Sequence, residues 1–418
     1  SGTYSVTFIV TDGADFASNT VEIEVRDFIE IEPEPVTSDI IEPEPGTRDI
    51  IEAELRDADI KLAIDNATSD VARLKVQSVE KTKKVTVSIP VGQFDTAENK
   101  QIKKLEIDMG IAIVSINYDI LKGGDGTTPS ALQLSVEKVD ISTLPKEVRN
   151  MIGNNTVYDI NMSRDGKDVC SFKNADVVVS VNYTLKPYED PNKVVVYYIG
   201  DSGELKIVTN GRYNAATGKV EFKPVHLSKY VTVYADVTFT DIVDISWAKE
   251  SIEALAAREV IKGVGDGTFR PHNRVTRAEF IKMLMMAFEL AEDDDAMCSF
   301  SDVEQGAWYY DSIAAAQKLG IVKGRPDGTF GVNDEITRQD MAVMLYRMAM
   351  LLKHELGGNE NILTFIDEAD ISEYALEAVT AMQRAGIIKG VGGGRFEPKN
   401  NATRAEDAVI IYRLFKIL

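Results

Sequence analysis

The chain has 418 residues, 44% of them hydrophobic and 27% charged, which is typical of a globular protein and excludes a disordered, collagen-like or disulfide-stabilised chain. The length predicts about two to four domains, because one domain usually holds roughly 100–200 residues. The net charge of −21 would repel nucleic acid and anionic membrane surfaces, so we expect neither as a partner. No apolar run approaches the roughly 20 residues of a membrane helix, which predicts no membrane insertion.

Cysteine and histidine are scarce. The two cysteines, Cys170 and Cys298, lie far apart in regions of different character, and none of the three histidines is close to a cysteine or to another histidine in the sequence. These spacings predict no disulfide, no zinc site and no cysteine–histidine nucleophile.

Residues 1–27 contain two runs that alternate apolar with small or polar residues, at 4–10 and 21–25, around a turn. This pattern predicts a β-hairpin. Two strands alone are marginal in water, so we expect earlier strands of a β-sandwich before Ser1. The hairpin resembles the last two strands of bacterial immunoglobulin-like surface modules.

Residues 28–57 contain an acidic ten-residue repeat, IEPEPVTSDI at 31–40 and IEPEPGTRDI at 41–50. Alternation of Glu and Pro favours extended polyproline II geometry, which repulsion between like charges extends further. We interpret the segment as a solvated, semi-rigid spacer, with a cation-binding tract as the alternative.

Residues 58–238 predict an antiparallel β domain, because apolar residues there recur mostly with period two. The clearest strands are predicted at 84–91, 111–118, 176–185, 193–200, 219–225 and 230–237, with a short helix at 144–151. No chemistry is visible in this region. It is similar to the β-rich segment that often precedes the C-terminal modules of Gram-positive surface proteins.

A repeat of about 60 residues follows, in units 239–299, 300–364 and 365–418. Each unit begins with Phe-x-Asp and continues with an amphipathic stretch, a glycine-rich turn and a Thr-Arg-x-acid motif before a second apolar stretch. The pattern predicts helix, loop and helix in each unit. The first helices are predicted at 251–263, 312–324 and 378–390.

The Thr-x-x-acid spacing at the start of each second helix is that of a capping box. In this motif the threonine oxygen accepts a hydrogen bond from a backbone amide of the first turn, and the carboxylate accepts one from the threonine's own amide. The predicted capping pairs are Thr276 with Glu279, Thr337 with Asp340, and Thr403 with Glu406.

An arginine occupies the first helical position of all three motifs: Arg277, Arg338 and Arg404. A cation there opposes the positive end of the helix dipole, at a cost of up to about 1 kcal/mol, so its recurrence needs another reason. Exposed beside free backbone amides, the arginine would bind an anionic ligand such as a carboxylate. Alternatively, each arginine pairs with an acidic residue of the neighbouring repeat and clamps the repeats together.

The two tryptophans, Trp247 and Trp308, occupy equivalent positions just before the first helices of repeats one and two. A tryptophan face beside hydrogen-bonding groups suits the apolar face of a sugar ring. A tryptophan also serves as a core anchor, and the sequence leaves both interpretations open.

Together, Phe-x-Asp, Trp, Gly-Asp-Gly-Thr-Phe and Thr-Arg-Ala-Glu in three tandem units resemble surface-layer homology (SLH) modules over residues 239–418. The resemblance implies an all-α, pseudo-three-fold bundle of helix-loop-helix repeats that binds pyruvylated secondary cell-wall polysaccharide. It implies that the three arginines bind the pyruvyl carboxylate. It also implies further ligand-binding candidates, which are Lys262, Lys323 and Lys389, and Asp241, Asp302 and Asp367. The aspartates would either fix the loop or accept sugar hydroxyls.

Repeat three departs from this pattern. Glu373 stands where the tryptophan is expected, and the turn GGGRF at 392–396 lacks the aspartate of the other two turns. We therefore predict three unequal binding grooves and assign the weakest to Arg404.

The sequence as a whole predicts a multidomain β-plus-α protein outside the cell, anchored noncovalently to the bacterial wall, with wall polysaccharide and other surface-layer proteins as partners. A second interpretation makes it the wall-binding part of a larger surface enzyme, a polysaccharide hydrolase, or of a scaffold whose active part lies upstream. No facing pair of carboxylates stands out in 58–238, so we predict that the chain itself is not an enzyme. A third interpretation is a lattice protein with calcium at Asp293–Asp295 or in the spacer. The ligand spacing of a dedicated calcium loop is missing, so we predict no cofactor and no metal site.

Overall fold

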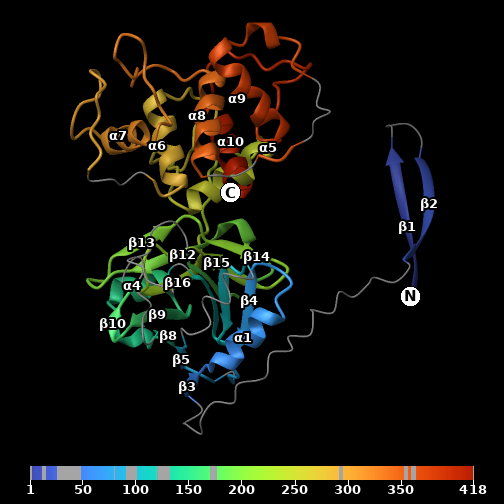
Figure 1. Cartoon of the computed structure of the whole chain (residues 1–418). Coiled ribbons are helices and arrows are strands. Elements are labelled where there is room, and N and C mark those ends of the chain that lie inside the picture. The colour runs from blue at the N-terminus through green and yellow to red at the C-terminus, as the bar shows by residue number, and fades with distance from the viewer. Residues whose placement is uncertain are drawn as a thin grey trace.

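The computed structural model describes an N-terminal hairpin, a β domain and a helical domain (Figure 1). The described residues are 2–11, 16–25, 49–79, 81–90, 101–118, 120, 132–169, 177–290, 295–352, 356–358 and 364–417. The prediction of a multidomain β-plus-α protein is confirmed. Most of the predicted acidic spacer, Asp293, Asp294 and Cys170 lie outside the described residues.

The N-terminal hairpin consists of β1 (Gly2–Thr11) and β2 (Phe16–Val25). The strands are antiparallel, with Gly2 opposite Val25 and Thr11 opposite Phe16. They pair with no other strand of the described chain. The larger immunoglobulin-like module stays a prediction.

The β domain contains two sheets. In the first, the strand order is β13-β12-β16-β9-β8-β5-β3, with β10 beside β9, and in the second it is β14-β15-β11-β7-β6-β4. The first sheet comprises β3 (Ile50–Glu54), β5 (Lys84–Ile89), β8 (Leu132–Lys138), β9 (Val157–Arg164), β10 (Lys167–Asp168), β12 (Val194–Ile199), β13 (Leu205–Val208) and β16 (Lys229–Tyr234). The second comprises β4 (Val71–Lys75), β6 (Lys104–Asp108), β7 (Ala112–Asn117), β11 (Val177–Asn182), β14 (Arg212–Asn214) and β15 (Lys219–Phe222).

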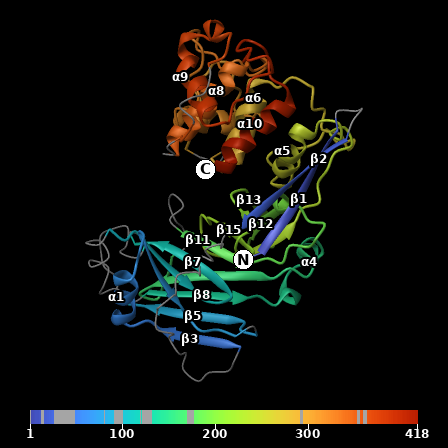
Figure 2. The same ribbon diagram turned by 90° about the vertical axis from the view of Figure 1, so that its right-hand side faces the viewer.

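The two sheets bury one apolar layer between them. Val85 and Leu134 of the first sheet belong to the same buried cluster as Ile107, Val114 and Val179 of the second. Figure 2 shows β3, β5 and β8 side by side in the first sheet. The helices of this domain are α1 (Asp57–Asp65) and α4 (Lys146–Ile152), with single turns η1 (Ile141–Thr143) and η2 (Pro191–Lys193).

Two features of this domain differ from the sequence-based prediction. The sheets are not wholly antiparallel, because β3 pairs with β5, and β4 with β6, in parallel. The chain crosses from one sheet to the other between successive strands from β3 to β6, so alternate strands run the same way. The predicted spacer also extends too far, since β3 lies within it and buries Ile51 and Ala53.

The helical domain takes two helices from each repeat. The first helices are α5 (Ser246–Ala257), α7 (Tyr310–Lys318) and α9 (Glu373–Arg384), the last preceded by η3 (Glu368–Asp370). The second helices are α6 (Arg277–Ala287), α8 (Arg338–Leu351) and α10 (Arg404–Ile417). The second helices contact one another, and each packs against the first helix of another repeat: α6 on α7, α8 on α9, and α10 on α5.

The first helices end earlier than predicted. Gly320 and Gly386 follow α7 and α9 with φ of 76° and 71°, a left-handed conformation that terminates a helix. Lys262, Lys323 and Lys389 therefore lie in the turns beyond the helices rather than in their last residues.

The turn after each first helix packs on the phenylalanine of the Phe-x-Asp motif. Phe300 lies 5.7 Å from Phe330, measured between ring centroids, and the other two repeats form equivalent ring pairs. A Cβ atom at Gly324 would lie 2.2 Å from the Phe300 ring, so only glycine fits there. The recurring Phe, Gly and Phe thus build one loop three times.

Candidate functional site

The start of each second helix is capped as the motif predicts. The Thr276 side chain accepts from the Glu279 amide, and the Glu279 carboxylate accepts from the Thr276 amide at 2.8 Å. Thr403 and Glu406 form the same reciprocal pair. In repeat two the Thr337 side chain accepts from the Asp340 amide.

The three arginines lie at junctions between repeats. The Nε atoms of Arg277, Arg338 and Arg404 donate to the carbonyls of Phe330, Phe396 and Phe269, at 2.9, 2.8 and 2.9 Å. Each guanidinium also lies over the ring of the same phenylalanine, 4.5–5.2 Å from its centroid. Repeat one thus contacts the loop of repeat two, repeat two that of repeat three, and repeat three that of repeat one.

Two of these arginines also form ion pairs across the junctions. Arg277 pairs with Asp340 at 2.8 Å, and Arg338 with Glu406 at 2.5 Å. Burial lowers the pKa of Arg404, and the charge of Glu279 opposes that shift. The acidic residue that caps one helix therefore also neutralises the arginine of the preceding repeat.

The premise that the arginines are exposed beside free amides is wrong. Arg277 and Arg338 are each only 8% exposed, and their backbone amides donate to the carbonyls of Asp334 and Asn400. The ion pairs offset the unfavourable helix dipole, which is the clamp that the sequence left as an alternative. Contact of the arginines with a ligand stays a prediction.

The three aspartates of the Phe-x-Asp motifs hold the turns. Asp302 accepts hydrogen bonds from the amides of Phe330, Gly331 and Val332, at 2.7, 2.7 and 3.2 Å. Asp241 and Asp367 each accept two equivalent bonds in their own repeats. Burial raises the pKa of Asp302, but these amide bonds outweigh it and leave the pKa below its usual value.

Replacing Asp302 by asparagine should lower the free energy of unfolding of the helical domain by about 2 kcal/mol, because charge-assisted amide bonds are lost. The aspartate contributes stability above its unfolded pKa and loses it as the pH falls through the lower folded pKa. Urea unfolding at pH 7 and pH 3 measures both effects. Asp244→Asn, at an exposed position of repeat one, is the control. Equal unfolding curves for the two variants would contradict this role.

The lysines of the turns are exposed, and their backbone meets the arginines. Arg404 Nη2 donates to the Lys262 carbonyl at 2.9 Å, and Arg338 Nη2 to the Lys389 carbonyl at 3.4 Å. Lys323 is exposed at the corresponding position of repeat two. Two of the junctions thus bring an arginine of one repeat to the lysine of another.

Both tryptophans are on the surface. Trp247 is 55% exposed and Trp308 56% exposed, so neither is buried as a core anchor. Lys282 of α6 lies over the Trp308 ring, with Nζ 5.2 Å from its centroid, and donates to the Trp308 carbonyl at 2.7 Å. The start of α7 is therefore fixed beside α6.

Sequence reasoning missed Tyr374, which follows Glu373 and is 59% exposed. Its hydroxyl donates to Asp340 at 2.7 Å and accepts from the Gln339 amide group at 2.9 Å. Asp340 also pairs with Arg277, so this junction joins side chains from all three repeats. Burial and then Asp340 raise the pKa of the Tyr374 hydroxyl. An aromatic residue one position after the missing tryptophan was the available signal.

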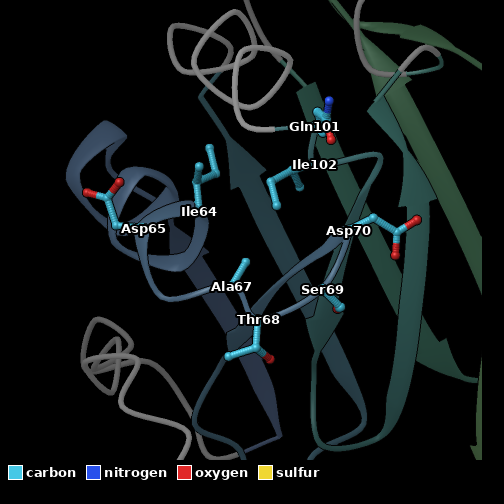
Figure 3. A pocket seen from close by; sticks show the side chains of 8 residues that line it. All are labelled: Ile64, Asp65, Ala67, Thr68, Ser69, Asp70, Gln101 and Ile102. Carbon is cyan, nitrogen blue, oxygen red and sulfur yellow. The ribbon is translucent and has the colours of Figure 1, made fainter.

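The β domain contains a surface hollow beside the end of α1, lined by residues that include Asp65, Thr68, Ser69 and Asp70. Figure 3 shows the carboxyl groups of Asp65 and Asp70 pointing away from each other. Glycoside hydrolysis requires two carboxyl groups that face one bond. The hollow does not provide that arrangement.

Comparison with known proteins identifies the helical repeats. The S-layer homology domain model matches residues 238–281, 299–342 and 365–406. The chain carries three S-layer homology domains. The SLH domains coincide with the three units recognised from sequence, and they make this a cell-surface, cell-wall-associated protein. In the described part of the chain, no helix has both the length and the apolar character needed to cross a bilayer.

The relatives of the chain include enzymes and S-layer proteins. It is 34% identical over 307 residues to an amylopullulanase of Thermoanaerobacterium thermosulfurigenes, covering 73% of this chain and 16% of the relative. It is 40% identical over 181 residues to the exoglucanase XynX of Acetivibrio thermocellus, covering 43% and 16%. It is 34% identical over 182 residues to the S-layer protein sap of Bacillus anthracis, covering 44% and 22%.

These relatives contradict our prediction that the protein is not an enzyme, because an amylopullulanase and an exoglucanase share its sequence. The prediction considered only carboxylate pairs within the β domain. The chain spans about a sixth of the length of each of those two relatives.

Proposed function

We propose that the SLH domains anchor this surface protein by binding pyruvylated secondary cell-wall polysaccharide at the junctions between repeats. SLH domains imply attachment to the cell wall. The observation that carries the finer proposal is that two junctions bring an arginine of one repeat to a lysine of another. Cations suit a pyruvyl carboxylate, and an exposed aromatic ring beside them suits a sugar.

We further propose that the three repeats form a pseudo-three-fold body. Arginine-to-phenylalanine contacts run from repeat one to two, from two to three, and from three back to one. The helix pairs α6–α7, α8–α9 and α10–α5 follow the same order. A closed cycle of equivalent contacts supports three related grooves around the second helices.

The grooves differ in their aromatic residue, which changes our assignment of the weakest one. Tyr374 bonds to the Asp340 that pairs with Arg277. By equivalence of the repeats, Trp247 belongs to the groove of Arg338 and Trp308 to that of Arg404. Glu373 then adds its negative charge to the groove of Arg277. We therefore assign the weakest groove to Arg277 rather than to Arg404.

Replacing Trp308 by alanine should weaken binding of a monovalent pyruvylated saccharide to its groove roughly three- to tenfold, because an aromatic contact contributes about 0.5–1.5 kcal/mol. The melting temperature should not change, since the side chain is mostly exposed. Calorimetric titration of the full chain measures the affinity. Tyr188→Ala removes an exposed aromatic of the β domain and serves as the control. Retention of the wild-type chain on walls stripped of the pyruvylated polymer would refute the proposal.

We also infer that the anchored protein is a polysaccharide hydrolase, which is our alternative interpretation of the sequence. The support is that an amylopullulanase, an exoglucanase and an endoglucanase are among the proteins that match this chain. In such a protein the anchor would hold a separate catalytic domain at the wall. Assaying the whole gene product for hydrolysis of pullulan and of β-glucans tests this inference, and no hydrolysis of either would contradict it.

A further inference from the structure

The ring of repeats has one seam that the order of the chain does not close. Repeats one and two, and repeats two and three, are consecutive, whereas repeat three meets repeat one only through α10 on α5 and the contacts nearby. Arg404 bonds to the carbonyl of Lys262, 142 positions earlier. The seam therefore depends on noncovalent contacts alone.

Arg258, at the end of α5, joins this seam to the β domain. It is 3% exposed, and its guanidinium donates to the carbonyls of Asn192, Thr209 and Gly211, at 2.5, 3.2 and 2.9 Å. Burial lowers its pKa to about 10. Carbonyl groups satisfy this buried cation, and three of them belong to the β domain.

One residue of the β domain, Asn192, contacts both helices of the seam. Its carbonyl accepts from Arg258 of repeat one, while its side-chain oxygen accepts from the Tyr412 hydroxyl of α10 at 2.8 Å. Its side-chain amide is 3.4 Å from Glu250 of α5. Asn192 thus links α5 to α10 directly.

Arg212 of β14 binds the last turn of α10. Its guanidinium donates to the carbonyls of Phe415 and Lys416, the latter at 3.2 Å, and lies 4.4 Å from the centre of the Phe415 ring. Carbonyls at the end of a helix lack partners within it, and a cation suits the negative end of the dipole. In Figure 1 the C-terminus and α5 lie on the side of the helical domain that faces the β domain.

Further contacts extend this interface. Glu289, just after α6, accepts from the amide and hydroxyl of Thr209, at 2.5 and 3.0 Å. Lys193 and Glu253 form an ion pair at 3.1 Å, and each side chain is less than 10% exposed. The helices of the seam are thus held by a short region of the β domain between Lys193 and Arg212.

The sequence of repeat one departs from its sister repeats where it meets the β domain. Arg258 and Glu259 stand where repeat two has Leu319-Gly320 and repeat three has Ala385-Gly386. Glu259 has φ of 57°, a strained conformation for a residue other than glycine. Its carboxylate accepts from the Tyr197 hydroxyl at 3.0 Å. The side chain that strains the turn is one that contacts the β domain.

We propose that the β domain is an intramolecular clasp that holds the seam between SLH repeats three and one closed. By fixing α5 and α10 it positions the groove of Arg338 and Trp247, whose side chains adjoin the starts of these helices. The match to the amylopullulanase supports a joint module, because its 307 residues exceed the 180 residues from 239 to 418 and so include part of the β domain. This inference rests on the ring of repeats proposed above.

The test restores the sister sequence with the full-length double variant Arg258→Leu/Glu259→Gly. Amide exchange in α5 and in the last turns of α10 should quicken about tenfold, because hydrogen bonds of a charged group are lost. Exchange in α8 and α9, which pair with each other away from this interface, should not change and is the internal control. Affinity for a monovalent pyruvylated saccharide should fall in the Trp247 groove but not in the Trp308 groove.

Two further variants complete the experiment. Arg325→Leu removes an arginine of repeat two that pairs with Asp334 away from the seam, and it should leave exchange at α5 unchanged. If the double variant fails to fold, Asn192→Ala tests the clasp from the β domain without altering the repeats. Unchanged exchange at the seam, or an equal rise in all helices, would overturn the clasp. Exchange requires no ligand, so failure of wall binding by the wild type would refute the proposed function and leave the clasp standing.

Discussion

Replacing Arg338 by alanine should lower the free energy of unfolding of the helical domain by about 3 kcal/mol. The arginine side chain is 9% exposed and pairs with Glu406, and removing one partner of a buried pair leaves the other charge unpaired, at a cost of about 3–5 kcal/mol. The lower end of that range applies because the Glu406 side chain is 25% exposed. Denaturant unfolding of the full chain at pH 7 measures the loss.

Arg338→Ala also separates the two interpretations of the arginines. The double variant Arg338→Met/Glu406→Leu removes both charges and should recover most of the lost stability, since replacing both partners by apolar groups is often neutral. If Arg338→Ala removes ligand binding while leaving the unfolding curve unchanged, the arginine is a ligand-binding residue without a clamping role. If it lowers stability and the double variant does not recover it, the clamp explanation is wrong.

Replacing Asp407 by methionine should raise the free energy of unfolding at pH 7 by about 2 kcal/mol. Asp407 of α10 is fully buried, and neither carboxyl oxygen has a hydrogen-bond partner. Such a group typically costs about 1–3 kcal/mol. The sister repeats place buried Phe280 and Met341 at the same position. Methionine therefore restores a residue that the architecture already accommodates.

The stability of the wild type should also depend on pH through Asp407. Burial, together with Glu406 and Glu279, raises the pKa of Asp407 well above its usual value, against the opposing charges of Arg404 and Arg338. The native state then keeps a proton that the unfolded chain releases, so stability falls as the pH rises above the unfolded pKa of about 3.9.

Urea unfolding between pH 4 and pH 8 tests this dependence. Asp407→Asn keeps the shape of the side chain, cannot ionise, and should remove this part of the pH dependence, while recovering less stability than methionine because its amide is still buried. A methionine variant less stable than the wild type at pH 7 would show that the carboxyl group has a stabilising partner.

The sequence by itself determined the local features of this protein. Thr276 with Glu279, and Thr403 with Glu406, cap their helices because the spacing of a capping box lies within one turn. The three SLH units were recognisable because Phe, Gly and Phe recur wherever the same loop closes. Strands such as β5 and β12 followed from alternation, which depends only on residues two positions apart.

Only the tertiary structure decided which parts of the chain meet. Arg277 contacts a carbonyl 53 positions away, and Arg404 one 142 positions away, so no local pattern could show that these side chains are buried or which repeat supplies the aromatic residue. The parallel strand pairs arise because the chain crosses between sheets, which alternation does not record. Arg258 and Glu259 looked like ordinary variation within a repeat until the fold placed them against the β domain. Periodicity reports the environment of each residue, whereas the identity of its neighbour depends on how distant elements pack.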